Sequence, residues 1–304
     1  METVTVFTST YNRGYCLNQC YTSLLRQTCK DFLWLIIDDG STDNTRELVG
    51  VWQSKDNGFK IQYIYKQNEG LFSGYTTAFK HIRTELCVSV DSDDYLTDDA
   101  IEQIINCWKK KGSSAYAGII GLDCLSNGDV IGDRFPNQAT INPIDLLIGK
   151  YRLKNGDRKF IVRTELYKMV VPFDSVPGEK DFNPEYLHLQ IGKQYDFIVL
   201  NLPLCIVNYQ PDGMTQNVFK HYYRSPNSYR IMRQLDLSLP GGTWLFYAKK
   251  TIHYISSCIL SKSPCISGTP HKIMAFILYP VGVFFTIIVV MKNKRFKKAG
   301  TRHL

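Results

Sequence analysis

Leu86-Cys87-Val88-Ser89-Val90-Asp91-Ser92-Asp93-Asp94 joins a short apolar run to three carboxylates. The apolar half has the length and composition of a buried strand. In open α/β sheets, ligands bind beyond the carboxyl ends of the strands, and the carboxylates would lie there. The stretch therefore indicates both a type of fold and the edge of the sheet where a ligand would bind.

The same alternation extends over the first 120 residues. Apolar runs of strand type occur at 4–9, 33–37, 61–65, 86–90 and 117–120, and segments with helical spacing lie between them at 17–25, 47–52, 76–83 and 98–108. Repeats of strand and helix predict βαβ units and a mostly parallel sheet with helices on both faces. Beyond 120, we expect strands at 160–163 and 197–207 and short helices at 143–148 and 185–192. The expected domains are an α/β domain at 1–225 and a helical region with a basic tail at 226–304.

Polar clusters follow each of the first four expected strands. They are Thr8–Arg13, Asp38–Ser41, Gln67–Gly70 and Asp91–Asp94. A single Asp at such a position is often only a helix N-cap. Because the ends of parallel strands meet at one edge of the sheet, four clusters together favour a binding site.

The carboxylates of Asp91, Asp93 and Asp94 repel one another unless they share a cation. Mg²⁺ or Mn²⁺ held by one or two carboxylates, with a diphosphate in the remaining positions, suits them. A solvated acidic turn is the alternative. Neither the glycine pattern of dinucleotide-binding folds nor that of P-loops follows any strand, so a metal is a better candidate for holding phosphate than a glycine cradle.

The four clusters, in this order and spacing, resemble those of glycosyltransferase family 2, most strongly over residues 1–120. The resemblance implies a GT-A fold and inverting transfer from a nucleoside-diphosphate sugar such as a UDP-sugar. It also implies metal ligands at Asp93 and Asp91. The implied donor-binding residues are Thr8 and Tyr11 near the uracil or ribose, Asp39 on the base, Asp91 near the ribose, and Arg13, Asn68 and Ser92.

An inverting displacement also needs a base to take the proton from the acceptor hydroxyl, whereas the metal stabilises the leaving group. In similar bacterial enzymes this base follows a proline at the start of a short helix, and Glu185 matches that position. Asp181 and Glu179 are the second and third candidates. Many relatives have adjacent Glu and Asp here and this chain does not. Glu185 could instead be a first-turn residue favoured by the helix dipole.

For one further segment and one histidine, a structural explanation competes with the functional one. The segment 209–215 resembles a loop at the mouth of the site in these relatives, but it also fits a plain β-turn. His221 could bind metal or phosphate, although a lone His in a Tyr-rich stretch is more often a packing or surface residue.

Composition limits the class of protein. Hydrophobic residues make up 44% of the 304 residues, which is enough for a packed core. The net charge of +8 is concentrated in a basic tail from Lys292 to Arg302, so we expect no nucleic-acid partner. The nine cysteines form no Cys-x-x-Cys pair and are expected to be free thiols in a reducing compartment.

The segment 273–291 is apolar and carries no formal charge. It is long enough to cross a bilayer, but a single crossing would separate the basic tail from a cytosolic enzyme. No signal peptide precedes the first strand, so we expect the catalytic part in the cytosol. Pro280-Val281-Gly282 suggests a hairpin or an interfacial helix, and 244–260 is a possible amphipathic helix. We therefore expect a peripheral or monotopic protein on the cytoplasmic face of a bacterial membrane.

The expected acceptor is a saccharide or a polyprenyl-linked saccharide used in bacterial surface polysaccharide synthesis. Two other classes compete with this hypothesis. A phosphatase would need a nucleophile after the first strand, where the chain has Thr10-Tyr11-Asn12. A binding protein without activity would not need a base such as Glu185.

Overall fold

The computed structural model describes residues 2–154, 156–170, 176–210 and 217–300, with the side chains of 295–300 left out. Packing divides the chain into two compact units. The first contains Met1–Phe173 and Leu187–Tyr209, and the second contains Asp174–Tyr186 and Gln210–Leu304. The division falls within one short helix, α7 (Glu185–Gly192). The domain limits expected from the sequence, 1–225 and 226–304, stay a prediction.

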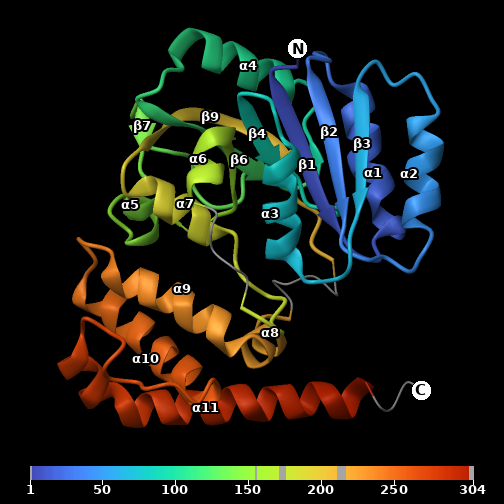
Figure 1. Ribbon diagram of the computed structural model, residues 1–304. Coiled ribbons are helices and arrows are strands. Elements are labelled where there is room, and N and C mark those ends of the chain that lie inside the picture. Colours follow the sequence, from blue (N-terminus) through green and yellow to red (C-terminus); the bar gives the residue numbers. More distant parts are fainter. Residues whose placement is uncertain (1, 155, 171–175, 211–216, 301–304) are drawn as a thin grey trace. The chain divides into compact units, whose positions relative to one another are not determined.

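The first unit is built on one mixed sheet with the strand order β3-β2-β1-β4-β8-β6-β9-β5, and β7 pairs with β9 (Figure 1). The strands are β1 (Val4–Thr10), β2 (Phe32–Asp38), β3 (Lys60–Tyr65), β4 (Leu86–Ser89), β5 (Tyr95–Leu96), β6 (Tyr116–Cys124), β7 (Thr140–Ile141), β8 (Arg158–Arg163) and β9 (Asp196–Ile206). The first four core strands are parallel to one another. Beyond them, β8 is antiparallel to both β4 and β6.

Helices cover both faces of this sheet. They are α1 (Gly14–Arg26), α2 (Thr45–Gln53), α3 (Leu71–His81), α4 (Ala100–Lys111), α5 (Pro143–Leu147), α6 (Thr164–Val170) and most of α7. On one face, Tyr21 of α1 stacks on Trp52 of α2 with ring centroids 4.3 Å apart, and Trp34 of β2 lies beside both. On the other, Phe7 of β1 meets Tyr75 of α3 at 5.0 Å. The α/β class predicted from the sequence is confirmed.

The second unit is helical. It contains α8 (Val218–Arg224), α9 (Pro226–Ser238), α10 (Trp244–Leu260) and α11 (Lys272–Gly300), and α10 packs on both α9 and α11. Asp236 of α9 is fully buried and accepts hydrogen bonds from Arg233 at 2.6 Å and Lys250 at 2.7 Å. These ion pairs compensate the negative charge of the buried Asp236 carboxylate, which would otherwise destabilise the unit.

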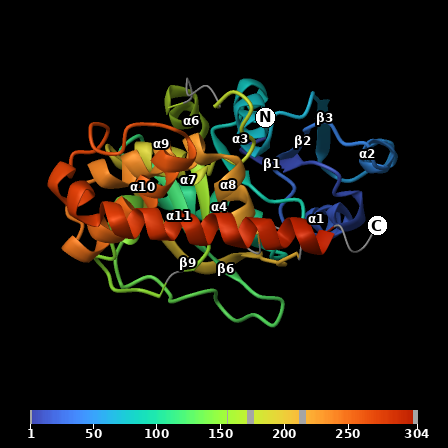
Figure 2. The same ribbon diagram turned by 90° about the horizontal axis from the view of Figure 1, so that it is seen from below.

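The hairpin expected around Pro280 is wrong, because α11 continues through this proline as one helix (Figure 2). A proline removes one backbone hydrogen bond but does not by itself end a helix that is packed on both sides of it. Ala275 is fully buried before Pro280. After it, Gly282 lies so close to α10 that an added Cβ would be 2.5 Å from Ile255.

Candidate active site

Four loops at the carboxyl ends of β1, β2, β3 and β4 lie at one edge of the sheet, because these strands are parallel neighbours (Figure 1). Backbone hydrogen bonds extend the sheet into the loops: Asp39 donates to Thr10 and Lys66 donates to Asp38. The four polar clusters predicted from the sequence therefore come together in space.

The first two loops are held together by side chains. The backbone N–H of Asn12 donates to the Ser41 hydroxyl at 2.8 Å, and the Thr42 N–H donates to the Asn12 amide oxygen at 2.7 Å. The Gly14 N–H donates to the Asp43 carboxylate at 2.9 Å. Asn12 has a positive φ of 52°, which asparagine tolerates better than most residues. These bonds fix the loop that carries Tyr11 and Arg13.

Asp39, predicted to bond the nucleobase, holds the third loop in place. One carboxylate oxygen accepts from the Glu69 N–H at 3.0 Å and from Lys66 Nζ at 2.8 Å, and the other accepts from the Gly70 N–H at 2.7 Å. Only 2% of Asp39 is exposed. Its carboxylate therefore fixes the backbone around Asn68, and the base contact expected of it stays a prediction.

Gly40 allows this arrangement. Its φ is +86°, and a Cβ at this position would be 2.8 Å from the backbone nitrogen of Asn68. Both the dihedral angle and the space exclude an ordinary side chain. The second and third loops therefore approach each other as backbone against backbone.

Besides Asp39, two more of the residues predicted to bind the donor are buried. Thr8 is fully buried, and its hydroxyl accepts a hydrogen bond from Trp34 Nε1 at 3.0 Å. Ser92 is 6% exposed. Strand alternation turns the Thr8 side chain toward the core, and its expected place near the nucleoside stays a prediction. By contrast, Tyr11 is 48% exposed.

The environments of the three clustered carboxylates differ. Asp91 is exposed, Asp93 is half-buried with Arg13 Nη1 3.8 Å from its carboxylate, and Asp94 is buried. In the described parts of the chain, no group of three His, Cys, Asp or Glu side chains is arranged to hold a metal ion. Mg²⁺ and Mn²⁺ commonly take one or two carboxylates and complete their shell with phosphate and water. Asp91 and Asp93 therefore fit a metal that binds together with a diphosphate.

Behind this cluster lies a buried charged group formed by Asp94, Asp123 and Lys159, which come from one loop and two strands. Lys159 of β8 is 8% exposed, and its Nζ lies 3.8 Å from the carboxylate of Asp123 on β6. Burial raises the pKa of Asp123 to about 6 and that of Asp94 to about 8, while Lys159 opposes both shifts. One oxygen of Asp94 accepts from the Asn208 N–H at 3.1 Å, which links the loop after β4 to the segment that follows β9.

Glu185, the first candidate base, begins α7, as the sequence predicted. Its backbone N–H donates to the Asn183 side chain at 2.9 Å, and its carboxylate is exposed. Desolvation by nearby protein atoms raises the pKa of Glu185, and Lys250 opposes this. Because the residue is exposed, contact with solvent screens this shift.

The other two candidate bases are engaged in holding the second unit together. Asp181 pairs with His221 Nδ1 at 2.8 Å and accepts from the Ser225 hydroxyl at 3.0 Å. Glu179 accepts from the backbone of Asn227 and Ser228 at the start of α9. A carboxylate with both oxygens engaged by protein donors is a poorer base than an exposed one. Of the three candidates, Glu185 is the most exposed, and its role as the base stays a prediction.

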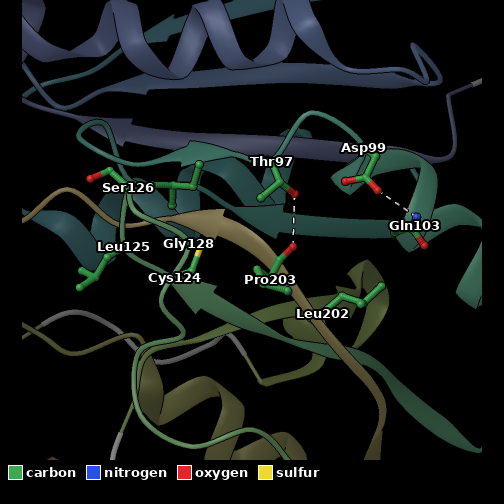
Figure 3. Close-up of a pocket in the computed structure, with 10 residues that line it drawn as sticks. Thr97, Asp99, Gln103, Cys124, Leu125, Ser126, Gly128, Leu202 and Pro203 are labelled. Atoms are coloured by element: carbon green, nitrogen blue, oxygen red, sulfur yellow. Dashed lines mark hydrogen bonds between the residues drawn. The ribbon is translucent and has the colours of Figure 1, made fainter.

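Figure 3 shows a pocket that is lined by none of the predicted site residues. It encloses about 350 Å³ beside β5, β6 and β9, next to Thr97, Cys124 and Leu202. The candidate site is instead an open edge formed by loops. The loop predicted at 209–215 lies largely outside the described residues.

Sequence reasoning did not single out Lys66, Asp123 or Lys159. Lys66 directly follows β3, so the strand-end rule that selected Asn68 could also have selected it. Asp123 and Lys159 are 36 positions apart and meet only because β6 pairs with β8. No local pattern predicts such a pair.

Comparisons with known proteins agree with this geometry. The family model described as Glycosyl transferase family 2 matches residues 5–168. Glycosyltransferase GlyG of Streptococcus pneumoniae serotype 4 is 27% identical over 274 residues, which cover 86% of this chain and 82% of GlyG. Chondroitin synthase of Escherichia coli is 32% identical over 132 residues, which cover 43% of this chain and only 19% of that synthase.

Among solved structures, TarS 1-349 of S. aureus in complex with UDP-GlcNAc is similar with a TM-score of 0.62 at 17% identity, covering 100% of this chain and 92% of that one. The sheet and its strand-end loops thus define an α/β fold of the GT-A type. The chain belongs to glycosyltransferase family 2, because the family model spans more than half of it.

Proposed function

We propose that this glycosyltransferase moves a sugar, of the hexosyl or N-acetylhexosaminyl type, from a UDP-sugar to a hydroxyl of a saccharide or polyprenyl-linked saccharide, with inversion. The single observation that carries the proposal is the convergence of four polar loops at one sheet edge, one of which carries Asp91 and Asp93. TarS has been solved with UDP-GlcNAc, which supports UDP as the nucleotide.

In this proposal, Asp93 and Asp91 hold Mn²⁺ or Mg²⁺, which neutralises the leaving diphosphate when bound. Arg13, now beside Asp93, adds a second positive charge near the phosphates. Tyr11, 48% exposed, and Asn68, half-buried, line the nucleoside. Asp39, through its three protein donors, keeps the loop around Asn68 in position.

Glu185 is the proposed base. Its exposed carboxylate can take the proton from the acceptor hydroxyl as that oxygen attacks the anomeric carbon. Asn183 caps the first turn of α7 and thereby fixes the backbone from which Glu185 projects. The acceptor belongs to bacterial surface polysaccharide synthesis, and the enzyme acts on the cytoplasmic face of the membrane.

Hydrolysis of a panel of UDP-sugars with Mn²⁺ tests the proposal. We expect Asp93→Asn to lower the rate at least about tenfold, because charge at the diphosphate is lost. Asp98→Asn is the matched control, since Asp98 also pairs with an arginine, Arg26 at 2.9 Å, but lies away from the loops. Equal rates for wild type and Asp93→Asn, or no turnover of any donor, would contradict the proposal.

A further inference from the structure

The C-terminal helix α11 carries a stripe of large apolar side chains on its outer side, and most of its fully buried inner positions are small or polar. The outer stripe consists of Ile273, Phe276, Ile277, Phe284, Ile287 and Met291, whose exposed fractions lie between 50% and 78%. The inner positions Ala275, Gly282, Thr286, Val289 and Asn293 are buried. Helices on the surface of water-soluble domains have the opposite pattern.

This inverted pattern is typical of a helix that faces lipid. Small residues let two helices approach closely where no water drives them together. Gly282 does this here, since an added Cβ would meet Ile255 of α10 at 2.5 Å. A continuous exposed apolar stripe of this kind marks a surface that another apolar phase covers.

The inner side of α11 is attached to the rest of its unit along its length. Met274 lies 3.5 Å from the Thr251 hydroxyl, Phe285 lies 4.6 Å from the His253 ring, and Lys292 lies 4.1 Å from the Phe219 ring. These partners belong to α10 and α8, and α10 also carries Lys250 in its ion pair with Asp236. A helix crossing the bilayer would take these charged and polar groups to the depth of the hydrocarbon, where they are costly.

The charges at the ends of the helix indicate which lipid surface fits. Lys272 precedes the outer stripe, Lys292 and Lys294 follow it, and no acidic residue lies between 272 and 294. Trp244 and Leu245 at the start of α10 are also 70% and 71% exposed. Exposed aromatic and basic side chains around an apolar stripe suit the headgroup region of an anionic bilayer.

We infer that the outer stripe of α11 lies in the plane of an anionic lipid surface and that α11 does not cross it. This makes the membrane attachment in the proposed function specific to one helix face. This lipid contact does not depend on the transfer reaction, so an experiment can contradict the lipid contact and leave the proposed reaction standing, or the reverse.

Flotation of the full-length protein with vesicles tests the contact. The probes are phosphatidylcholine vesicles with and without phosphatidylglycerol. We expect Phe276→Glu with Phe284→Glu to lower partitioning into both at least about tenfold, because two apolar side chains leave the lipid. Met169→Glu, an equally exposed position in the first unit at 68%, should bind like the wild type. Unchanged binding of the double variant would overturn the inference.

A lysine variant and a measurement of the oligomeric state test the lipid contact independently of the double variant. Lys292→Gln should reduce binding to the anionic vesicles about fivefold, as expected for about 1 kcal/mol per basic residue, and leave the zwitterionic vesicles unaffected. If a second copy covers the stripe instead, the lipid-free wild type will be a dimer that the double variant dissociates, with vesicle binding unchanged. That result would overturn the inference.

Protease protection then tests the orientation. An epitope tag after Leu304 should stay accessible to protease added outside sealed vesicles, because an in-plane helix keeps both ends on one side. Protection of the tag would show that α11 crosses the bilayer and would overturn the inference.

Discussion

Three neighbouring carboxylates in one turn have three different surroundings. Asp91 is exposed, Asp93 faces Arg13, and Asp94 lies in the interior with Asp123 and Lys159. The sequence predicted the cluster and ranked Asp94 last as a metal ligand. It could not predict the buried partners of Asp94, because Lys159 is 65 positions away and reaches it only through the pairing of β8 with the sheet.

Asp94→Asn should be tolerated. The amide oxygen still accepts from the Asn208 N–H. Burial raises the pKa of Asp94 to about 8, so its favourable contribution to stability is present below its unfolded value and is lost as pH rises toward 8. Relative to wild type, the variant should therefore gain stability between about pH 4 and 8. Urea denaturation across this range measures the difference, and a constant difference would contradict the assignment.

Asp123→Asn, by contrast, should destabilise the protein. It leaves Lys159, 8% exposed, without its paired carboxylate and should cost about 3–5 kcal/mol of the free energy of unfolding. The same urea titration at neutral pH compares it with Asp94→Asn. If both variants cost the same, Lys159 is not paired chiefly with Asp123.

Glu185→Gln should lower kcat about 10²- to 10⁴-fold without loss of donor binding, because only proton transfer is removed. Glu165→Gln is the control, since Glu165 is also an exposed glutamate in the first turn of a short helix, α6. Steady-state rates and a UDP titration on both variants measure the two effects. Equal rates would mean that Glu185 serves only the helix dipole.

The conformation of each loop depends on the loops beside it, because the hydrogen bonds that hold it come from them. The sequence predicted where each strand ends, since the change from apolar to polar residues is local. It did not predict that Asp39 binds the backbone of Glu69 and Gly70, which requires the parallel pairing of β2 and β3. Of its two alternatives at Pro280, the hairpin was wrong, since the sequence did not show the packing of α11 on α10 that keeps the helix intact.

Gly40→Ala should disrupt the second and third loops together. A positive φ of 86° and a Cβ at 2.8 Å from the Asn68 nitrogen should cost about 1–3 kcal/mol of stability and weaken UDP binding. Gly50→Ala in α2 is the control, because no atom lies within 4 Å and alanine should add about 0.5–1 kcal/mol there. Thermal melts and UDP titrations of both variants check this. Normal binding by Gly40→Ala would contradict the loop geometry.

At the scale of the whole molecule, a family 2 sheet carries the donor loops and a helical unit carries the exposed Glu185 and the outer stripe of α11. The sequence was sufficient for the fold class and family, because their motifs are local and ordered along the chain. The sugar, the acceptor and the linkage depend on loop shape and on ligands, so the sequence could not identify them.

Metal-dependent UDP binding shows whether a metal and the donor bind together at this edge of the sheet. In a calorimetric titration, we predict that the wild type binds UDP with Mn²⁺ and loses most of this affinity when the metal is chelated. Asp93→Asn should bind at least about tenfold more weakly with Mn²⁺, and Asp98→Asn should bind as the wild type does. UDP binding that is unchanged by chelation and by Asp93→Asn would contradict a metal and donor site at this edge of the sheet.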